Sequence, residues 1–145
     1  MTNKLEKRKV VVLIPYYKNG EEIYVYIQRR SQNAMRLPGY FGFFGGGIEG
    51  TELPEEALLR EIKEELNIDI ENFAHFSKYE FYGSIIEVYT LEVQSDFADN
   101  LIVSEGDYGK FFSEQEIMNE SKMIYQDKVV LSNFFGKLKR NNPYV

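Results

Sequence analysis

The chain has no cysteine, and histidine occurs once, at position 75. Without cysteine the protein can form neither disulfides nor thiolate metal sites, and a single histidine cannot build a histidine-based zinc centre. Any bound metal must therefore be held by oxygen atoms, which are the donors that Mg²⁺, Mn²⁺ and Ca²⁺ prefer.

Basic charge is also in short supply, because 17 Lys and Arg residues face 23 Asp and Glu residues and the formal net charge is −6. Proteins that bind nucleic acid through its phosphates carry a basic surface, so nucleic-acid binding is not expected. The apolar run near the start, residues 10–15, is too short for a signal segment or a membrane span. We therefore expect a soluble, cytoplasmic protein without a membrane partner; a homodimer is compatible with the sequence.

Length and composition predict one domain. A chain of 145 residues with 43% hydrophobic residues has the size and the apolar content for one core. Residues 1–9 are polar and charged and are expected to be frayed. Strands are predicted at residues 10–17 and 23–29, because β-branched and aromatic residues flank an Asn-Gly pair. The glycine-rich residues 31–51 are predicted to form a loop.

A helix is predicted over residues 54–66. Pro54 suits a first helical position, and acidic residues follow it in the first turn. Leu59, Ile62 and Leu66 recur at helical spacing and are expected to pack against a sheet. Asn67 tolerates the left-handed conformation that commonly ends a helix.

The C-terminal half shows the same kinds of pattern. Strands are expected at residues 76–82, 84–94 and 101–103. Ser113 and Glu116 form a capping box that predicts a helix start. A last helix is predicted over residues 125–139, with four apolar residues turned inward: Val129, Val130, Phe134 and Leu138.

Three glutamates on the first helix are the strongest candidates for chemistry. Glu61, Glu64 and Glu65 are spaced i, i+3 and i+4, so their carboxylates share one face of a helix. Two unit charges about 5 Å apart repel by roughly 3 kcal/mol at an effective dielectric near 20. Carboxylates that converge in a cleft must therefore bind a divalent cation or take up protons. A hard metal beside a glycine-rich loop could neutralise phosphate oxygens and activate water.

The sequence from Gly46 onward resembles the signature of the Nudix hydrolases, the MutT-like enzymes that cleave nucleoside diphosphate derivatives. That signature is a Gly, five residues, a Glu, seven residues, Arg-Glu, an aliphatic residue, any residue, Glu-Glu, any residue, a Gly and an aliphatic residue. The matching positions are Gly46, Glu52, Arg60, Glu61, Ile62, Glu64, Glu65 and Ile68. Asn67 replaces the last Gly but also tolerates a positive φ. Residues 37–46 are similar to the family's approach to the signature, except that Phe44 stands where Pro is usual.

The resemblance implies an α/β fold of a specific kind, an α/β/α sandwich with a mixed β-sheet, in which a loop–helix–loop holds Mg²⁺ or Mn²⁺. It implies that the metal ligands are Glu61, Glu64, Glu65 and the carbonyl of Gly45. Arg60 would pair with Glu52 or its neighbours and orient the helix carboxylates. Water would attack a phosphorus of a small nucleotide substrate, a nucleoside diphosphate derivative, and split its diphosphate bond.

The group that orients or deprotonates this water stays open between one of the signature glutamates and a carboxylate from a later loop. Some family members supply a Glu directly before an aromatic pair. Here the aromatic pair is residues 111–112 and the preceding residue is Lys110, so we favour Glu105 over Asp107 as the later acid.

Substrate contacts are expected from two places. Arg29 or Arg30, at the end of the second predicted strand, could bind phosphates, although a surface role is an equal alternative. The glycine loop is expected to approach the substrate through Gly46 and Gly47. The identity of the substrate cannot be read from the sequence.

Three other interpretations fit parts of the sequence. Residues 45–50 satisfy the G-x-G-x-x-G pattern of dinucleotide-binding folds, but Pro54 delays the helix and the helix face is acidic, so that fold is rejected. A non-catalytic nucleotide-binding module is the main alternative to an enzyme, and the presence of all three glutamates counts against it. A messenger cap-removing enzyme is disfavoured by the acidic charge.

Overall fold

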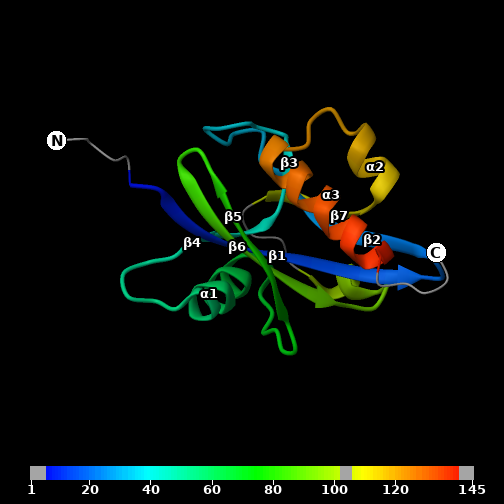
Figure 1. Ribbon diagram of the computed structural model, residues 1–145, viewed down its shortest axis with the longest axis horizontal. Coiled ribbons are helices and arrows are strands. Elements are labelled where there is room, and N and C mark those ends of the chain that lie inside the picture. The colour runs from blue at the N-terminus through cyan, green and yellow to red at the C-terminus, as the bar shows by residue number, and fades with distance from the viewer. Residues whose placement is uncertain (1–5, 102–105, 141–145) are drawn as a thin grey trace.

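The computed structural model describes residues 6–101 and 106–140. Its strands are β1 (Arg8–Asn19), β2 (Glu22–Arg30), β3 (Phe41–Gly42), β4 (Phe44–Gly47), β5 (Ala74–Phe81), β6 (Ser84–Glu92) and β7 (Gly106–Ser113). Its helices are α1 (Pro54–Leu66), α2 (Glu114–Asn119) and α3 (Tyr125–Arg140), with a short 3₁₀ helix η1 (Phe97–Asn100). The sheet lies between α1 on one face and α2 and α3 on the other, which confirms the expected α/β/α sandwich (Figure 1).

The sheet is mixed, and β1 is its central strand. The strand order is β3-β2-β1-β6-β5, with β4 added to β1 and β7 added to β2. β1 runs parallel to β6 and antiparallel to its other partners. Its first half pairs with β4, from Val10 opposite Gly47 to Leu13 opposite Phe44, and its last residues pair with β2. This pairing places the glycine-rich β4 beside the start of β1.

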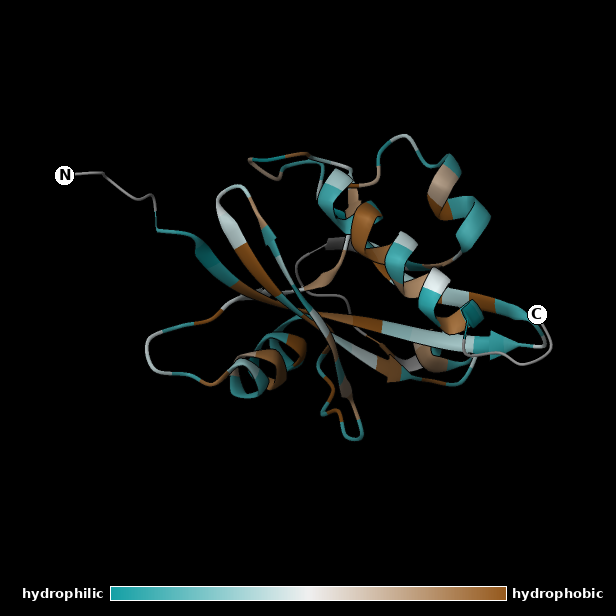
Figure 2. Ribbon diagram, viewed as in Figure 1, coloured by the Kyte–Doolittle hydropathy of each residue, from teal (hydrophilic) through white to brown (hydrophobic). Residues whose placement is uncertain are grey.

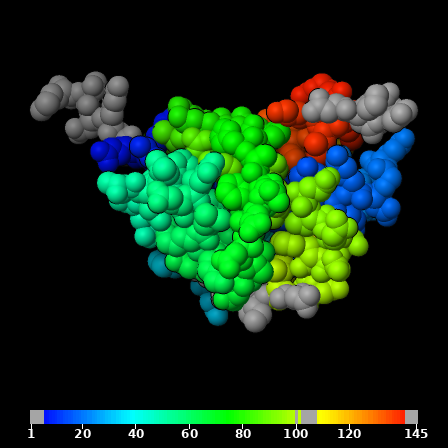
Figure 3. Space-filling view, turned by 90° about the horizontal axis from the view of Figure 1, so that it is seen from below, coloured from blue at the N-terminus to red at the C-terminus, as the bar shows by residue number. Residues whose placement is uncertain are grey.

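Alternation along β1 divides the interior into two cores. Val11 and Leu13 pack toward α1, whereas Val12 and Ile14 pack toward α2 and α3. Apolar stretches run along the middle of the central strands between the two helical layers (Figure 2). The view onto the α1 side shows this helix beside the green segment that follows it in the chain (Figure 3). Among the described residues, no helix is long and apolar enough to cross a membrane.

Several local predictions need correction. β1 begins at Arg8, which pairs with Ser84, so residues 8–9 belong to a strand instead of a frayed end. The predicted loop 31–51 contains β3 and β4, and β7 was not predicted at all. Glycines conceal β3 and β4, because a glycine carries no β-branched or aromatic signal. The expected strand 101–103 falls largely outside the described residues, since only Leu101 is described and it is not in a strand.

α1 has the predicted ends but a different inward face. It begins at Pro54, and Asn67 closes it in the left-handed region at φ 58° with its N–H donating to the carbonyl of Lys63. Leu59, expected to pack inward, is 42% exposed, and Leu58 is fully buried in its place. Leu58, Ile62 and Leu66 are spaced by four residues, so the inward face follows the i, i+4 direction.

The C-terminal helices agree more closely with expectation. α2 is capped by Ser113, whose hydroxyl accepts from the N–H of Glu116 while the Glu116 carboxylate accepts from the N–H of Ser113. In α3, Val130 and Phe134 are buried as expected, whereas Val129 is half-buried and Leu138 packs against the edge of the core. Leu131 and Phe135 complete the inward face.

β4 packs too closely on β1 to carry side chains at every position. A Cβ added to Gly45 would lie 2.1 Å from the carbonyl oxygen of Val11, and Gly45 has a φ of +139°. A Cβ on Gly47 would meet nothing closer than the Arg8 guanidinium, at 3.5 Å. Gly45 is therefore required by the backbone, whereas Gly47 leaves room for a methyl group.

Asp127 joins α3 to the strands beneath it. It is 9% exposed, and its Oδ2 accepts a hydrogen bond of 3.1 Å from the N–H of Phe43, between β3 and β4. Burial raises the pKa of the Asp127 carboxyl to about 7, although the Phe43 N–H and the positive charge of Arg30 both favour the ionised form. The folded protein therefore binds this proton more tightly than the unfolded chain does.

We expect the Gly45→Ala substitution to lower the free energy of unfolding by roughly 3 kcal/mol, because the new Cβ collides with a backbone carbonyl at an unfavourable φ. Gly47→Ala is the matched control and should change it by less than about 1 kcal/mol. Urea unfolding of both variants measures the difference. Equal stability of the two variants would contradict the packing described for β4.

We expect Asp127→Asn to gain stability relative to wild type as the pH rises from about 4 to 7. Over this range the wild-type carboxyl is protonated when folded and ionised when unfolded, so its stabilising contribution is fully present below pH 4 and is lost as the pH approaches the folded pKa of about 7. The change is on the order of 3 kcal/mol. Urea midpoints at several pH values test this, with Asp96→Asn as the exposed control; a pH-independent difference would disprove it.

Candidate active site

Two of the signature glutamates, Glu61 and Glu65, lie against β4, and the glycines of that strand make room for them. A Cβ on Gly46 would lie 2.5 Å from the carboxyl carbon of Glu61, so only glycine fits beneath this side chain. The N–H of Gly45 donates a 2.8 Å hydrogen bond to Oε2 of Glu65, which is 2% exposed. α1 and β4 therefore fix two carboxylates against one short stretch of backbone.

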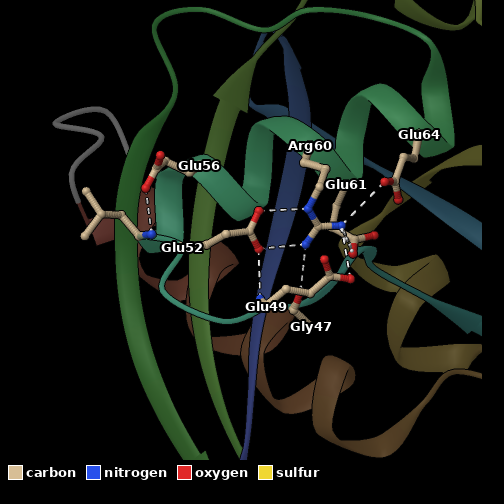
Figure 4. A network of polar contacts seen from close by, with 8 residues as sticks. Gly47, Glu49, Glu52, Glu56, Arg60, Glu61 and Glu64 are labelled. Carbon is tan, nitrogen blue, oxygen red and sulfur yellow. Dashed lines mark hydrogen bonds and ion pairs between the residues drawn. The ribbon is translucent and has the colours of Figure 1, made fainter.

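Arg60 is the centre of a polar network that joins α1 to the loop before it (Figure 4). Its guanidinium binds both carboxylate oxygens of Glu52, with Nε 2.8 Å from Oε2 and Nη2 2.9 Å from Oε1. Nη2 also donates to the carbonyl of Gly47 at 3.0 Å. Nη1 lies 2.9 Å from Oε1 of Glu61 and 3.5 Å from Oε1 of Glu64. The predicted pairing of Arg60 with Glu52 is present, and it is bidentate.

This network shifts the ionisation of its members. The hydrogen bonds from Arg60 and from the N–H of Glu49 lower the pKa of Glu52 to about 2. The same carboxylate raises the pKa of Arg60, and Glu61 adds to this effect. Glu52 is therefore negative and Arg60 positive throughout the physiological range of pH.

The three helix carboxylates do not converge on a common point in this structure. Within residues 6–101 and 106–140, no three His, Cys, Asp or Glu side chains are grouped closely enough to hold a metal ion. Glu61 and Glu64 turn toward the Arg60 guanidinium, whereas Glu65 turns toward the Gly45 amide. The helical spacing predicts that the three carboxylates gather on one face of α1, but they are divided between Arg60 and the Gly45 amide.

The donors nevertheless suit a hard divalent cation. Glu61 and Glu64 each approach one nitrogen of Arg60, so the structure already places a positive group between them. The Glu64 side chain is 50% exposed and can turn without disturbing the core, whereas the Glu61 side chain is 13% exposed and is held over Gly46. Carboxylate and carbonyl oxygens are the ligands that Mg²⁺ and Mn²⁺ prefer.

A cleft connects this region to Asp127. A cavity of about 460 Å³ lies beside β1 and the start of α3, with Asp127, Gly45 and Gly46 among its lining residues. A smaller cavity of about 210 Å³ is lined by Glu65 and shares four residues with the first: Gln28, Arg30, Phe43 and Gly45. The two cavities therefore adjoin at Gly45. A separate cavity of about 580 Å³, between β2, α2 and α3, contains none of the predicted site residues.

The predicted substrate-binding residues separate in the structure. Arg30 lines both adjoining cavities, whereas Arg29 lines neither and has its guanidinium 5.8 Å from the ring centre of Tyr108. Gly46 lines the larger cavity, and the Gly47 carbonyl is bound by Arg60. Glu105, proposed as the later acid, lies outside the described residues.

Sequence reasoning missed some residues of the cleft. Asp127 shares the inward face of α3 with Val130, Leu131 and Phe134, so a charged residue on an apolar helix face was an available signal. Gln28 gave no comparable signal. Its side-chain amide donates to the carbonyl of Phe43 at 3.1 Å, a contact that depends on strand pairing.

Comparisons with known proteins match most of the chain. A family model of the NUDIX domain matches residues 6–134. The 8-oxo-dGTP diphosphatase of Escherichia coli (strain K12) is 35% identical over 77 residues, which are 53% of this chain and 57% of that protein. The 8-oxo-dGTP diphosphatase of Proteus vulgaris is 44% identical over 46 residues, which are 32% of this chain and 40% of that protein. The matched regions thus span about half of these relatives.

Solved structures share the fold. A MutT structure, from work on the Aliivibrio salmonicida and Vibrio cholerae proteins, superimposes with a TM-score of 0.72 at 19% sequence identity. The match covers 91% of this chain and 99% of the MutT chain. The NUDIX domain of Shewanella oneidensis NrtR, complexed with ADP ribose, superimposes with a TM-score of 0.72 at 14% sequence identity. The match covers 92% of this chain and 89% of the NrtR chain. Because the NUDIX match extends over nearly the whole chain, the protein belongs to the Nudix family.

Proposed function

We propose that this protein is a metal-dependent pyrophosphohydrolase that splits the diphosphate bond of a nucleoside diphosphate derivative. The observation that carries the proposal is the placement of Glu61 and Glu64 around one cationic group beside Gly46, at the side of a cleft that leads to Asp127. Family membership supports the same reaction class.

Each residue of the site has a distinct proposed role. Glu61, Glu64, Glu65 and the Gly45 carbonyl would hold Mg²⁺ or Mn²⁺, and this ion would supply charge neutralisation at the phosphate oxygens and a more acidic water. Arg60 positions Glu61 and Glu64 while its own position is fixed by the bidentate contact with Glu52. The ordered backbone of Gly46 and Gly47 lets the substrate's phosphates approach these carboxylates.

The hydrolytic step needs an acceptor for the water proton. Water attacks one phosphorus, the bond from that phosphorus to the bridging oxygen breaks, and the bridging oxygen leaves with the second phosphate. A glutamate carboxylate of α1 or the Glu105 carboxylate takes the proton from the water. Arg30, which lines both cavities, is placed to contact phosphate oxygens.

The cavity of about 460 Å³ that contains Asp127 suits a nucleobase. Its walls include the apolar residues Val12, Phe43 and Ile86, and Asp127 lies among them with only Oδ2 used by the Phe43 amide. A flat ring with a polar edge would bury its faces against the apolar walls and present ring N–H groups to the carboxyl.

The relatives named 8-oxo-dGTP diphosphatase make a nucleoside triphosphate with an oxidised purine the first substrate to test. ADP ribose is the second, because it is bound by the NrtR domain. A cytoplasmic location and a homodimer stay predictions.

A non-catalytic nucleotide-binding module is the second candidate. In such a module the nucleotide would depend on the cavity and not on the α1 carboxylates. Nucleotide affinity that is unchanged by a metal chelator would favour the module, and affinity that depends on Mg²⁺ would favour the enzyme.

We expect Glu64→Gln to lower kcat roughly 100-fold, because it removes one negative oxygen donor and keeps the side-chain volume. Glu64 is half exposed, so the variant should fold as wild type does. Glu55→Gln, at an exposed position on the same helix, is the matched control and should stay within about 2-fold.

The assay uses Mg²⁺ or Mn²⁺ with 8-oxo-dGTP, unmodified nucleoside triphosphates, ADP ribose and a dinucleoside polyphosphate, and it identifies both products. No hydrolysis of any of these by wild type, or equal rates for wild type and Glu64→Gln, would disprove the proposed function. The cleavage position identifies the substrate class.

A further inference from the structure

Three arginines from three separate segments line the cavity of about 460 Å³ that contains Asp127. They are Arg8 in β1, Arg30 in β2 and Arg36 in the loop between β2 and β3. Within the described residues, none of the three guanidinium groups forms an ion pair, whereas Lys7, Lys18 and Arg60 are each paired with a glutamate. The chain carries a net charge of −6, so acidic partners are plentiful. Arg30 acts electrostatically on the buried Asp127 in the same cavity, but no carboxylate lies within ion-pair distance of the three guanidinium groups among the described residues. Three arginines placed in this way around one cavity indicate an anionic ligand.

Arg8 approaches the same glycine as the catalytic network does. A Cβ on Gly47 would lie 3.5 Å from Nη2 of Arg8, and the carbonyl of Gly47 accepts from Nη2 of Arg60 at 3.0 Å. The backbone N–H of Arg8 donates to the carbonyl of Gly83 in the turn between β5 and β6, which fixes the start of β1. A phosphate chain that passes Gly46 and Gly47 therefore comes within the range of Arg8.

Arg36 is held at the cavity by the backbone of its loop. Nε of Arg30 donates to the carbonyl of Arg36 at 2.9 Å. The N–H of Arg30 donates to the carbonyl of Tyr40 at 2.7 Å, and the N–H of Gly39 donates to the carbonyl of Arg30 at 3.1 Å. Leu37, which also lines the cavity, has a φ of 46°, so the chain turns sharply just after Arg36. These contacts order the loop before a ligand binds, which reduces the entropy cost of binding.

Possible substrates differ in whether they carry a phosphate outside the diphosphate bond that is cleaved. In a nucleoside diphosphate sugar, both phosphates belong to the bond that is cleaved, and the group beyond them is neutral. In a nucleoside triphosphate, one further phosphate remains outside the reacting pair. A guanidinium matches phosphate oxygens with two parallel hydrogen bonds, and three unpaired arginines provide more positive charge than the reacting diphosphate needs beside a bound cation.

We propose that Arg8 and Arg36 bind the phosphate of the substrate that is not part of the cleaved bond, and so select nucleoside triphosphates over diphosphates that end in a neutral sugar. The assignment rests on the proposed function for the reaction itself. It adds two positioning residues, Arg8 and Arg36, that lie outside the Nudix signature at residues 46–68. Arg8 lies in β1 and Arg36 in the loop between β2 and β3, on other elements than the α1 carboxylates, so we expect their effect to fall on binding.

The test compares Arg8→Gln, Arg36→Gln and the double variant with wild type, using 8-oxo-dGTP and ADP ribose as substrates. Each single variant should raise KM for the triphosphate about 10-fold and change KM for ADP ribose less than about 2-fold, with the effect on KM and not on kcat. Lys78→Gln, at an exposed position of β5 away from the cavity, is the matched control for the loss of one positive charge.

A binding measurement separates this inference from the proposed reaction. Titration calorimetry with a methylene-bridged, non-hydrolysable nucleoside triphosphate, in the presence of EDTA, reports the arginine contribution without metal or turnover. Binding by wild type that weakens roughly 10-fold or more in the double variant supports the inference even if no substrate is hydrolysed. Unchanged binding in the double variant, an equal loss for the triphosphate and ADP ribose, or the same loss in Lys78→Gln overturns it even if hydrolysis is established.

Discussion

Four carboxylates of the loop and helix, those of Glu49, Glu52, Glu61 and Glu64, lie within 3.9 Å of a single guanidinium. Their mutual repulsion requires a positive group among them, and Arg60 supplies one that stays charged at any physiological pH. The guanidinium is planar and must meet Glu52, Glu61 and the Gly47 carbonyl together, so it also fixes the rotation of α1 over β4. The positions of Glu52, Glu61 and Glu64 relative to β4 follow from this contact.

The glycine backbone of β4 lies between the Glu61 carboxylate and the cavity that contains Asp127, and it forms a thin wall between them. On one side Glu61 lies where a side chain of residue 46 would be, and on the other side Gly45 and Gly46 line the cavity that contains Asp127. A strand with ordinary side chains would separate the carboxylates from the cavity by several ångströms more. Because the wall is bare backbone, a ligand in the cavity can extend past it to the carboxylates, and one chain segment serves both binding and chemistry.

The parts of the site that depend on local spacing could be predicted, and those that depend on tertiary packing could not. α1, its left-handed end at Asn67 and the pairing of Arg60 with Glu52 all follow from residues close in sequence. β4 has almost no strand-forming residues, and its pairing with β1 compensates only in the folded protein. Asp127, Arg8 and Arg36 come from distant segments, so only the fold brings them to one cavity. The division of the three glutamates between Arg60 and Gly45 likewise depends on atoms outside their helix.

β1 bonds to β2, β4 and β6, so the start of this strand is enclosed by ladders on both sides. Releasing β4 from β1 would disrupt the central ladder of the sheet and expose both cores, which makes opening of the glycine wall part of cooperative, global unfolding. The amide protons along Val10–Leu13 should consequently exchange with solvent only at the rate set by complete unfolding. The loop that carries Arg36, tied mainly to the end of β2, belongs to a separate and less protected unit. The two parts of the cleft therefore differ in what holds them: β4 is held by the central ladder of the sheet, whereas the Arg36 loop is held by a few hydrogen bonds to the end of β2.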